Sequence, residues 1–158
     1  MKEFNIPNYG KITIRNIIFD INGTLQFKGQ ISEGLISKFA ELKKFYNVYL
    51  VSADTRGNLK ELADNLKVSF IKINPKGDSE AEAKNTELLK LGKEVTAAIG
   101  NGNNDNLMLK NSILGISVLG SEGVTVKSIL NSDVIVPDPL SAIDFLLDEK
   151  IMIGTLRA

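Results

Sequence analysis

The run from Ile17 to Leu25, IIFDINGTL, constrains the fold of this chain more than any other stretch. Residues of buried-strand character end in Asp20, and a polar turn containing Gly23 follows at once. A parallel strand covered on both faces has such an unbroken apolar run, and open α/β sheets bind ligands beyond the carboxyl ends of their strands. Asp20 therefore fits a site residue of a parallel sheet. It fits a hydrogen-bonding turn residue equally well, because turns are rich in Asp, Asn and Gly.

Strand-like and helix-like segments alternate along the rest of the chain. Residues 1–10 read as half of a hairpin, and apolar runs predict strands at 11–21, 46–53, 68–73, 95–99, 113–119 and 134–136. Apolar residues at helical spacing predict helices from a Ser32 cap to Phe45, then at 57–67, 79–91, 107–110, 122–130 and 139–148. The alternation predicts an α/β fold with a doubly wound, mostly parallel, Rossmann-like sheet. We expect a single domain over residues 1–158, since no linker or repeat interrupts the pattern.

Composition narrows the chemistry. The chain has 19 basic and 19 acidic residues, a net charge of zero, which argues against a nucleic-acid or membrane-surface role. It has no cysteine and no histidine, so catalysis would use carboxylates, lysine, hydroxyl groups, backbone groups or a hard cation. The first residues lack the apolar core of a signal peptide and no apolar run approaches membrane length, so we expect a cytoplasmic protein.

Polar residues follow three of the predicted strands. Asp20, Ser52 and the segment Asn101 to Asp105 each come directly after a buried run. The carboxyl ends of parallel strands share one edge of a sheet, so we expect these residues to converge. Lys84 would lie near the start of a helix that reaches the same edge, and Lys76 is an alternative cation.

Each of these residues also has a structural explanation. Ser52 fits a turn cap, and Lys84 fits a solvated helix residue paired with Glu80 at i,i+4. Four loop residues fit loop shaping as well as substrate contact: Asp54, Thr55, Asn103 and Asn104.

Taken together, the polar segments resemble the four motifs of the haloacid dehalogenase-like (HAD) phosphotransferases. They are Asp20-Ile21-Asn22-Gly23-Thr24, Ser52, Lys84 and the GNGNND run at 100–105. The resemblance covers Ile12 to about Asp148 and is strongest to the P-type ATPase branch and its small soluble relatives. It implies one HAD-like catalytic domain over residues 1–158.

The resemblance also implies a nucleophile and a metal. Asp20 would attack phosphorus and become an aspartyl phosphate, with Asn22 in the catalytic set. Mg²⁺ would be held by Asp20, the backbone carbonyl of Asn22, Asn101 and Asp105.

The remaining motif residues would hold the phosphate. Gly23 and Thr24 would bind phosphoryl oxygens with their backbone amides, Ser52 with its hydroxyl, and Lys84 would balance the charge that develops. The implied substrate is a phosphorylated small molecule, an acyl phosphate or a nucleotide, and a protein partner or homo-oligomer fits the same resemblance.

The chain departs from the family pattern at two positions. Asn22 stands where most HAD phosphatases have an acid/base Asp, and a carboxamide does not shuttle protons at neutral pH. Positioned proton transfer is typically worth ~10²–10⁴ in rate, so we expect slow hydrolysis. Asn101 stands where the family has a metal-binding Asp, so Mg²⁺ should bind weakly, with partial compensation by Asp105.

The spacing between the motifs bears on whether a cap domain is inserted. The gaps from Asp20 to Ser52 and from Ser52 to Lys84 are both 32 residues, which leaves no room for a cap domain.

The leading hypothesis for the function is a metal-dependent phosphatase or phosphotransferase. The alternative is a catalytically impaired HAD-like module that binds phosphate or a protein. A response-regulator receiver fits less well, because the chain lacks an acidic pair near its first strand and a phosphorylated Asp after its third.

Overall fold

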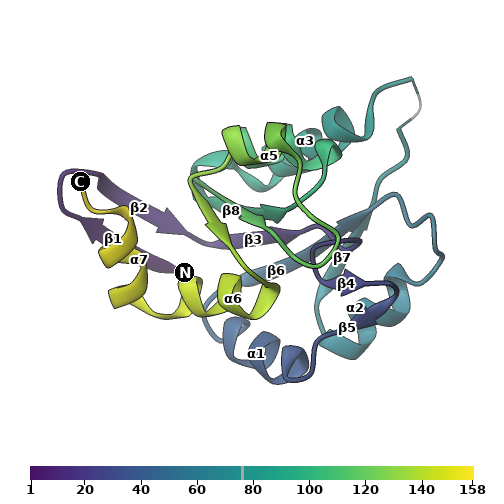
Figure 1. Cartoon of the computed structure of the whole chain (residues 1–158), viewed down its shortest axis with the longest axis horizontal. Coiled ribbons are helices and arrows are strands. Elements are labelled where there is room, and N and C mark those ends of the chain that lie inside the picture. Colours follow the sequence, from purple (N-terminus) through teal and green to yellow (C-terminus); the bar gives the residue numbers. More distant parts are fainter. Residues whose placement is uncertain (76) are drawn as a thin grey trace.

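A parallel sheet runs through the middle of the molecule, and its strands follow the buried apolar runs of the sequence (Figure 1). The computed structural model describes residues 1–75 and 77–158. Adjacent strands in the sheet are all parallel, which confirms the predicted α/β class. In spatial order the strands are β10 (Val134–Val136), β9 (Leu114–Val118), β8 (Thr96–Gly100), β3 (Asn16–Phe19), β6 (Asn47–Ser52) and β7 (Ser69–Lys72).

The strand order reverses beside β3. The chain moves from β3 outward to β6 and β7, then crosses back to β8 on the other side of β3. Phe19, the last residue of β3, pairs with Leu50 of β6 and with Ile99 of β8. Asp20 comes next, so it lies where the connections leave in opposite directions, which is where such sheets bind ligands.

Helices cover both faces of the sheet (Figure 1). One face packs on α3 (Glu80–Leu91) and α4 (Asn106–Asn111), which meet the sheet through Leu88, Met108 and Leu109. Short 3₁₀ turns at Lys93–Val95 and Asn103–Asp105 follow α3 and precede α4. The remaining helices around the sheet are α1 (Leu35–Leu42), α2 (Leu59–Leu66), α5 (Val126–Leu130) and α6 (Pro139–Leu147).

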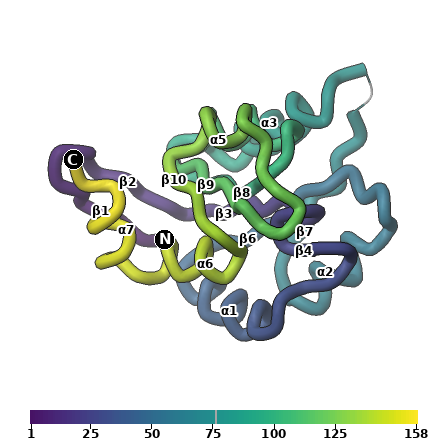
Figure 2. The backbone as a smooth tube through the Cα atoms, in the orientation of Figure 1, coloured from purple at the N-terminus to yellow at the C-terminus, as the bar shows by residue number. Residues whose placement is uncertain are grey.

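An antiparallel hairpin and a last helix lie together at one end of the molecule. The hairpin is β1 (Lys2–Ile6) with β2 (Gly10–Ile14), and α7 (Glu149–Leu156) packs against β1. The two chain ends lie in this region (Figure 2). The sequence predicted one helix ending at Asp148. The structure ends α6 at Leu147, close to this prediction, but a further helix, α7, follows. The Asp148 carboxylate accepts hydrogen bonds from the Lys150 and Ile151 amides in its first turn.

A second, small hairpin follows Asp20. It pairs β4 (Gln26–Phe27) with β5 (Gln30–Ile31) around a turn at Lys28-Gly29. The hairpin contacts the loop after β9. The Lys28 amide donates to the Glu122 carboxylate, and the Phe27 ring lies so close to Gly120 that a side chain there would clash with it. Strands of two residues carry no periodic pattern, so the sequence did not predict β4 and β5.

Two details of the predicted first helix are wrong. It begins at Leu35 with Gly34 as its N-cap residue, so Ser32 lies two residues before the cap position. Ile36 is exposed although it lies within α1, and Phe45 is exposed beyond the end of this helix at Leu42. Among residues 1–75 and 77–158, every helix is too short or too polar to cross a bilayer.

The contact between α1 and β3 should dominate the stability of this layer. Phe39 is fully buried, with its ring centroid 5.1 Å from that of Phe19. We expect Phe39→Ala to lower the free energy of unfolding by about 3–5 kcal/mol, because it removes an aromatic ring from a close-packed core. Ile36→Ala, at an exposed position of the same helix, should cost far less. Equal losses in urea unfolding would contradict this packing.

Candidate active site

A buried ion-paired cluster lies at the carboxyl end of β3. Lys84 of α3 donates to Asp20 Oδ1 at 2.5 Å and to Asp105 Oδ1 at 2.6 Å, and all three residues are at most 5 % exposed. The structure thus brings together a strand end, a helix and a distant loop, as the sequence predicted. The alternative pairing of Lys84 with Glu80 is wrong, since Glu80 accepts from Asn104 instead.

The surroundings of Asp20 and Lys84 in the cluster shift the pKa values of these two residues. Burial, reinforced by the charge of Asp105, raises the pKa of Asp20 to about 6, although Lys84 and Thr24 act in the opposite direction. Burial alone would lower the pKa of Lys84, but the two carboxylates outweigh it and raise that pKa. Lys84 therefore remains an ammonium, and Asp20 is a carboxylate at neutral pH that takes up a proton in mild acid.

Thr24 connects Asp20 to the loop after β8. Its hydroxyl lies 3.0 Å from Asp20 Oδ2 and 3.3 Å from Asn101 Oδ1. Gly23, with φ of 80°, makes this approach possible, since a Cβ there would lie 2.4 Å from Asn101 Nδ2. The glycine in this turn is therefore required by both its backbone angle and its neighbour.

The Asp105 carboxylate accepts hydrogen bonds within its own loop and also contacts Lys84. Its Oδ2 accepts from the amides of Asn101 at 3.0 Å and Gly102 at 2.9 Å, while Oδ1 contacts Lys84. A Cβ at Gly100 would lie 2.6 Å from Cβ and Cγ of Asp105. The predicted motif residues at 100–105 thus form one compact turn around a buried carboxylate.

Both polar atoms of the Asn101 carboxamide are hydrogen-bonded. Oδ1 faces the Thr24 hydroxyl, and Nδ2 donates to the Gly123 carbonyl at 3.0 Å. The same segment also holds the loop by its backbone: the Thr125 amide donates to Asn101 O, and Ser128 Oγ donates to Gly102 O at 2.6 Å. The sequence predicted a helix over 122–130, and the structure begins it at Val126 after the Thr125 cap. The contacts of this segment with Asn101 and Gly102 were not predicted.

Ser52 sits at the end of β6 but within its own turn. Its hydroxyl oxygen accepts from the Asp54 amide at 2.9 Å. Asp54 has a left-handed backbone (φ 58°), and its carboxylate accepts from the Leu59 amide and pairs with Lys72. The Leu59 bond, followed by Lys72, lowers the pKa of Asp54. These contacts support a turn-shaping role for both residues, and phosphate binding by Ser52 stays a prediction.

The backbone amides predicted to bind phosphate donate within the turn in this structure. The Gly23 amide donates to Gln26 O at 2.8 Å and the Thr24 amide to Ile21 O at 3.2 Å. Asn22 Oδ1, in contrast, is buried and has no partner among the described residues. Phosphate binding by the two amides would need these bonds to exchange, whereas the Asn22 carboxamide already has an unused acceptor.

The residues of the cluster fit a weak site for a hard cation. Residues 1–75 and 77–158 hold no group of three His, Cys, Asp or Glu side chains suited to a metal. Two carboxylates, the Asn101 carboxamide oxygen and the backbone carbonyl of Asn22 are nevertheless the kind of oxygen donors that Mg²⁺ accepts, with water completing its shell. The unpartnered Asn22 Oδ1 is the observation that favours an additional ligand here. Lys76, the alternative cation, lies outside the described residues.

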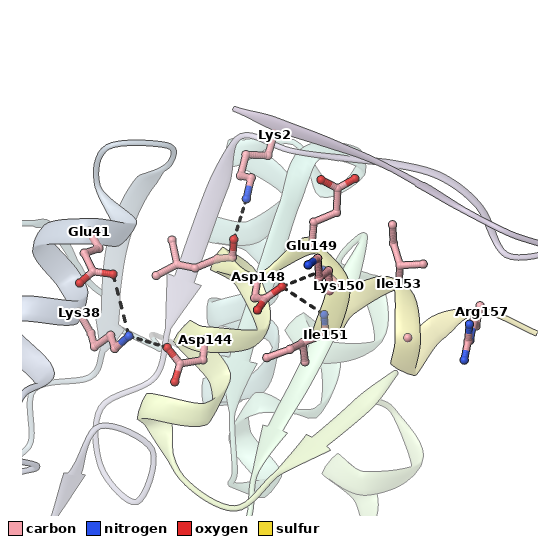
Figure 3. A pocket seen from close by; sticks show the side chains of 12 residues that line it. Lys2, Lys38, Glu41, Asp144, Asp148, Glu149, Lys150, Ile151, Ile153 and Arg157 are labelled. Atoms are coloured by element: carbon pink, nitrogen blue, oxygen red, sulfur yellow. Dashed lines mark hydrogen bonds and ion pairs between the residues drawn. The ribbon is translucent and has the colours of Figure 1, made fainter.

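A cavity with charged side chains in its lining lies away from the Asp20 cluster. It measures about 1170 Å³ and is bounded by α1, α6, α7 and β1 (Figure 3). Two of its lysines are partnered locally: Lys38 pairs with Asp144 at 2.7 Å, and Lys2 donates to Leu147 O at 2.8 Å. It lacks the buried, convergent charges of the Asp20 cluster, which is therefore the better candidate for chemistry.

Sequence comparison gives one relative without a known function. No protein-family model matches the chain. Over 60 residues, 38% of the chain, it is 55% identical to an uncharacterized protein of Methanocaldococcus jannaschii, and the match spans 64% of that relative's length.

Solved structures reveal the fold. The chain superposes on the 3-deoxy-D-manno-octulosonate 8-phosphate phosphatase of Moraxella catarrhalis, a complex with magnesium, phosphate and KDO, with a TM-score of 0.71 at 17% identity over 89% of this chain and 90% of that one. The fold is that of the HAD-type hydrolases. The cobalt-bound phosphatase of the same kind from Haemophilus influenzae gives 0.70 at 15% identity over 92% and 94%. A haloacid dehalogenase-like hydrolase from Bacteroides thetaiotaomicron gives 0.65 at 13% identity over 85% and 100%.

Replacing the buried Lys84 by an uncharged residue should strongly destabilise the fold. We expect Lys84→Met to lower the free energy of unfolding by about 3–5 kcal/mol at pH 8, because two buried carboxylates lose their partner. Lys90→Met is the matched control in α3, since Lys90 makes an exposed pair with Glu87 and should contribute less than about 1 kcal/mol. Similar losses for the two variants would argue against the buried cluster.

The raised pKa of Asp20 gives a stability prediction with a definite sign. The folded protein binds this proton more tightly than the unfolded chain, so the carboxylate destabilises the fold as pH rises from about 4 to about 6. In metal-free buffer, we expect Asp20→Asn to gain stability relative to the natural protein across this window, reaching about 3 kcal/mol at its upper end. Chemical unfolding at several pH values measures the difference, and a pH-independent result would contradict the prediction.

Proposed function

We propose that the chain is a HAD-type phosphohydrolase or phosphotransferase that works through an aspartyl phosphate on Asp20. The observation that carries the proposal is the buried cluster of Asp20, Lys84 and Asp105 at the point where the strand order reverses. Its support includes the phosphatase fold of the solved structures, two of which hold magnesium or cobalt. We also propose that the chain belongs with the P-type ATPase-like group, has no cap domain and is cytoplasmic.

The chemistry follows from the positions of the side chains. An ionised Asp20 oxygen attacks the phosphorus, and the bond from phosphorus to the leaving group breaks with its electron pair on the leaving oxygen. Lys84 stays protonated and offsets the negative charge beside Asp20. Water then attacks the phosphoenzyme, releases inorganic phosphate and regenerates the Asp20 carboxylate. A phosphotransferase would use an acceptor hydroxyl in place of water.

Mg²⁺ would be held by Asp20, Asn101, Asp105 and the backbone carbonyl of Asn22. Bound there, it would supply positive charge for the phosphate oxygens. The natural site has two carboxamides where acids are common in the family, so we propose weak metal binding and slow turnover. Leaving groups that depart without a proton, such as those of acyl phosphates and nitrophenyl phosphate, should be favoured.

The nucleophile is tested by substitution. We expect Asp20→Asn to abolish turnover of acetyl phosphate and phosphoenzyme formation, because an amide cannot form the aspartyl phosphate. Asp64→Asn, the same chemical change at an exposed position of α2, is the control that should leave turnover unchanged. The proposal fails if Asp20→Asn retains activity, or if the natural protein turns over neither acyl nor aryl phosphates with Mg²⁺.

The two carboxamides should respond differently to replacement by acid. Asn22→Asp supplies the missing acid/base and should raise turnover of alkyl phosphates, whose leaving groups need a proton, by ~10²–10⁴. Asn101→Asp should lower the Mg²⁺ concentration required. It also loses the Nδ2 donor to Gly123 O, so we expect a stability loss of about 1–3 kcal/mol in metal-free buffer that Mg²⁺ restores.

The controls follow from the same contacts. Thermal unfolding with and without Mg²⁺ separates metal binding from turnover in both variants. If both stay inactive and the natural protein still binds phosphate or a protein, the impaired module becomes the better function. The observation that favours this second function is the Asn101 carboxamide, whose oxygen and nitrogen are both already hydrogen-bonded within the protein.

A further inference from the structure

The sequence contains two Asn-Gly pairs, Asn22-Gly23 and Asn101-Gly102, and these are the two positions where a carboxamide replaces a common acid. Asparagine followed by glycine is chemically labile, because glycine has no side chain to shield its backbone nitrogen from the neighbouring carboxamide. Attack by that nitrogen gives a cyclic imide, and hydrolysis of the imide leaves an acid. Each pair is therefore an amide that the chain itself can convert to an acid.

The fold restrains both reacting groups of the Asn101-Gly102 pair. Asn101 Oδ1 faces the Thr24 hydroxyl, and Nδ2 donates to the Gly123 carbonyl at 3.0 Å. The Gly102 amide, which would be the attacking group, donates to the Asp105 carboxylate at 2.9 Å. Cyclisation would have to break all of these hydrogen bonds, so the structure protects this pair.

The Asn22-Gly23 pair is held less firmly. Asn22 Oδ1 has no hydrogen-bond partner among the described residues, and the side chain is partly exposed, so ammonia released there can reach solvent. The Gly23 amide donates to Gln26 O at 2.8 Å. Gln26 begins β4, a strand of two residues, and such short elements open locally at low free energy. Opening of this small hairpin frees the attacking nitrogen.

We propose that Asn22 is a self-modification site, at which the folded protein converts this residue to aspartate while Asn101 stays an amide. The Gly23 nitrogen forms a bond to Asn22 Cγ and gives up its proton. The bond from Cγ to Nδ2 breaks, and ammonia leaves with that proton. Water then adds to Cγ and breaks its new bond to the Gly23 nitrogen, which leaves the peptide bond intact and a carboxylate on the side chain. Water attack at the Asn22 backbone carbonyl would instead give isoaspartate.

The conversion supplies the acid/base group that the candidate active site lacks. A carboxyl group can protonate a leaving alkoxide, whereas a carboxamide cannot. Newly made protein would therefore be slow on alkyl phosphates, and converted protein faster. The inference rests on the proposed function only for this gain in turnover, since the conversion itself depends on the Asn-Gly pair and its contacts.

Peptide mass spectrometry measures the conversion at each pair. The natural protein is held in mildly alkaline buffer, and a second sample is held in guanidinium chloride, where both pairs lose their folded contacts. We expect similar rates at the two pairs in denaturant. In the folded protein Asn22 should convert at least about tenfold faster than Asn101, because fewer hydrogen bonds hold it. Asn22→Gln is the matched control, since its longer side chain forms the larger imide ring slowly and should keep its amide.

Loosening the hairpin should accelerate the reaction at Asn22 alone. Gly29, in the turn between β4 and β5, has a φ of 80°, which a β-branched residue adopts only with strain. We expect Gly29→Val to raise the conversion rate of Asn22 by about three- to tenfold and to leave that of Asn101 unchanged. Equal acceleration at both pairs would mean that conversion needs global unfolding, and would overturn the proposal.

Turnover assays separate this proposal from the proposed function. Hydrolysis of alkyl phosphates by the natural protein should rise in step with the fraction converted, and the Asn22→Gln protein should show no rise. If aspartate accumulates at position 22 but neither the aged protein nor Asn22→Asp hydrolyses any phosphate ester, the proposed function fails and the modification site stands. If Asn22→Asp hydrolyses alkyl phosphates but the folded natural protein keeps its amide, forms only isoaspartate, or converts Asn101 equally fast, the modification site is overturned and the enzyme stands.

Discussion

The compensation of charge around Lys84 determines how the site is built. An ammonium and two carboxylates are removed from water together, and none of them is stable there alone. Lys84 contacts both acids only if α3 packs with its first turns at the carboxyl edge of the sheet. The loop after β8 must also return Asp105 to the same point. One buried cation thus fixes the relative position of a strand end, a helix and a loop.

The same charge balance explains how the two carboxamides fit this chain. Asp20, Asp105 and Lys84 together carry a net charge of −1, and acids at positions 22 and 101 would raise this to −3 beside a single cation. Asn101 adds no charge and instead links Thr24 to the Gly123 carbonyl. The carboxamides therefore let the cluster stay closely packed around one ammonium, whereas a site with more acids would depend more heavily on bound metal.

The sequence predicted the sheet and the residues that converge on it, for physical reasons. A buried parallel strand has a continuous apolar run, so Asp20 at its end could be placed with no knowledge of tertiary contacts. The sequence placed Lys84 at the same edge of the sheet but left pairing with Glu80 open, because both arrangements are compatible with its position in the chain. The amide orientation of Asn101 depends on a carbonyl 22 residues away, and α7 was missed although Asp148 is a readable cap. The local sequence pattern was sufficient to predict the helices and strands, whereas the hydrogen-bond partners of these side chains depend on tertiary packing.

The meeting of β1 with α7 has a consequence for how the chain acquires its structure. The hairpin formed by residues 2–14 is completed by a helix that begins at Glu149, and the Ala158 amide donates to Pro7 O. Such contacts join residues separated by nearly the whole sequence, and loop closure over that distance is entropically expensive. During synthesis the hairpin emerges well before residues 149–156, so no helix covers it until α7 has also been made. The apolar face of β1 is therefore left without its partner on the nascent chain while the whole parallel sheet is synthesised.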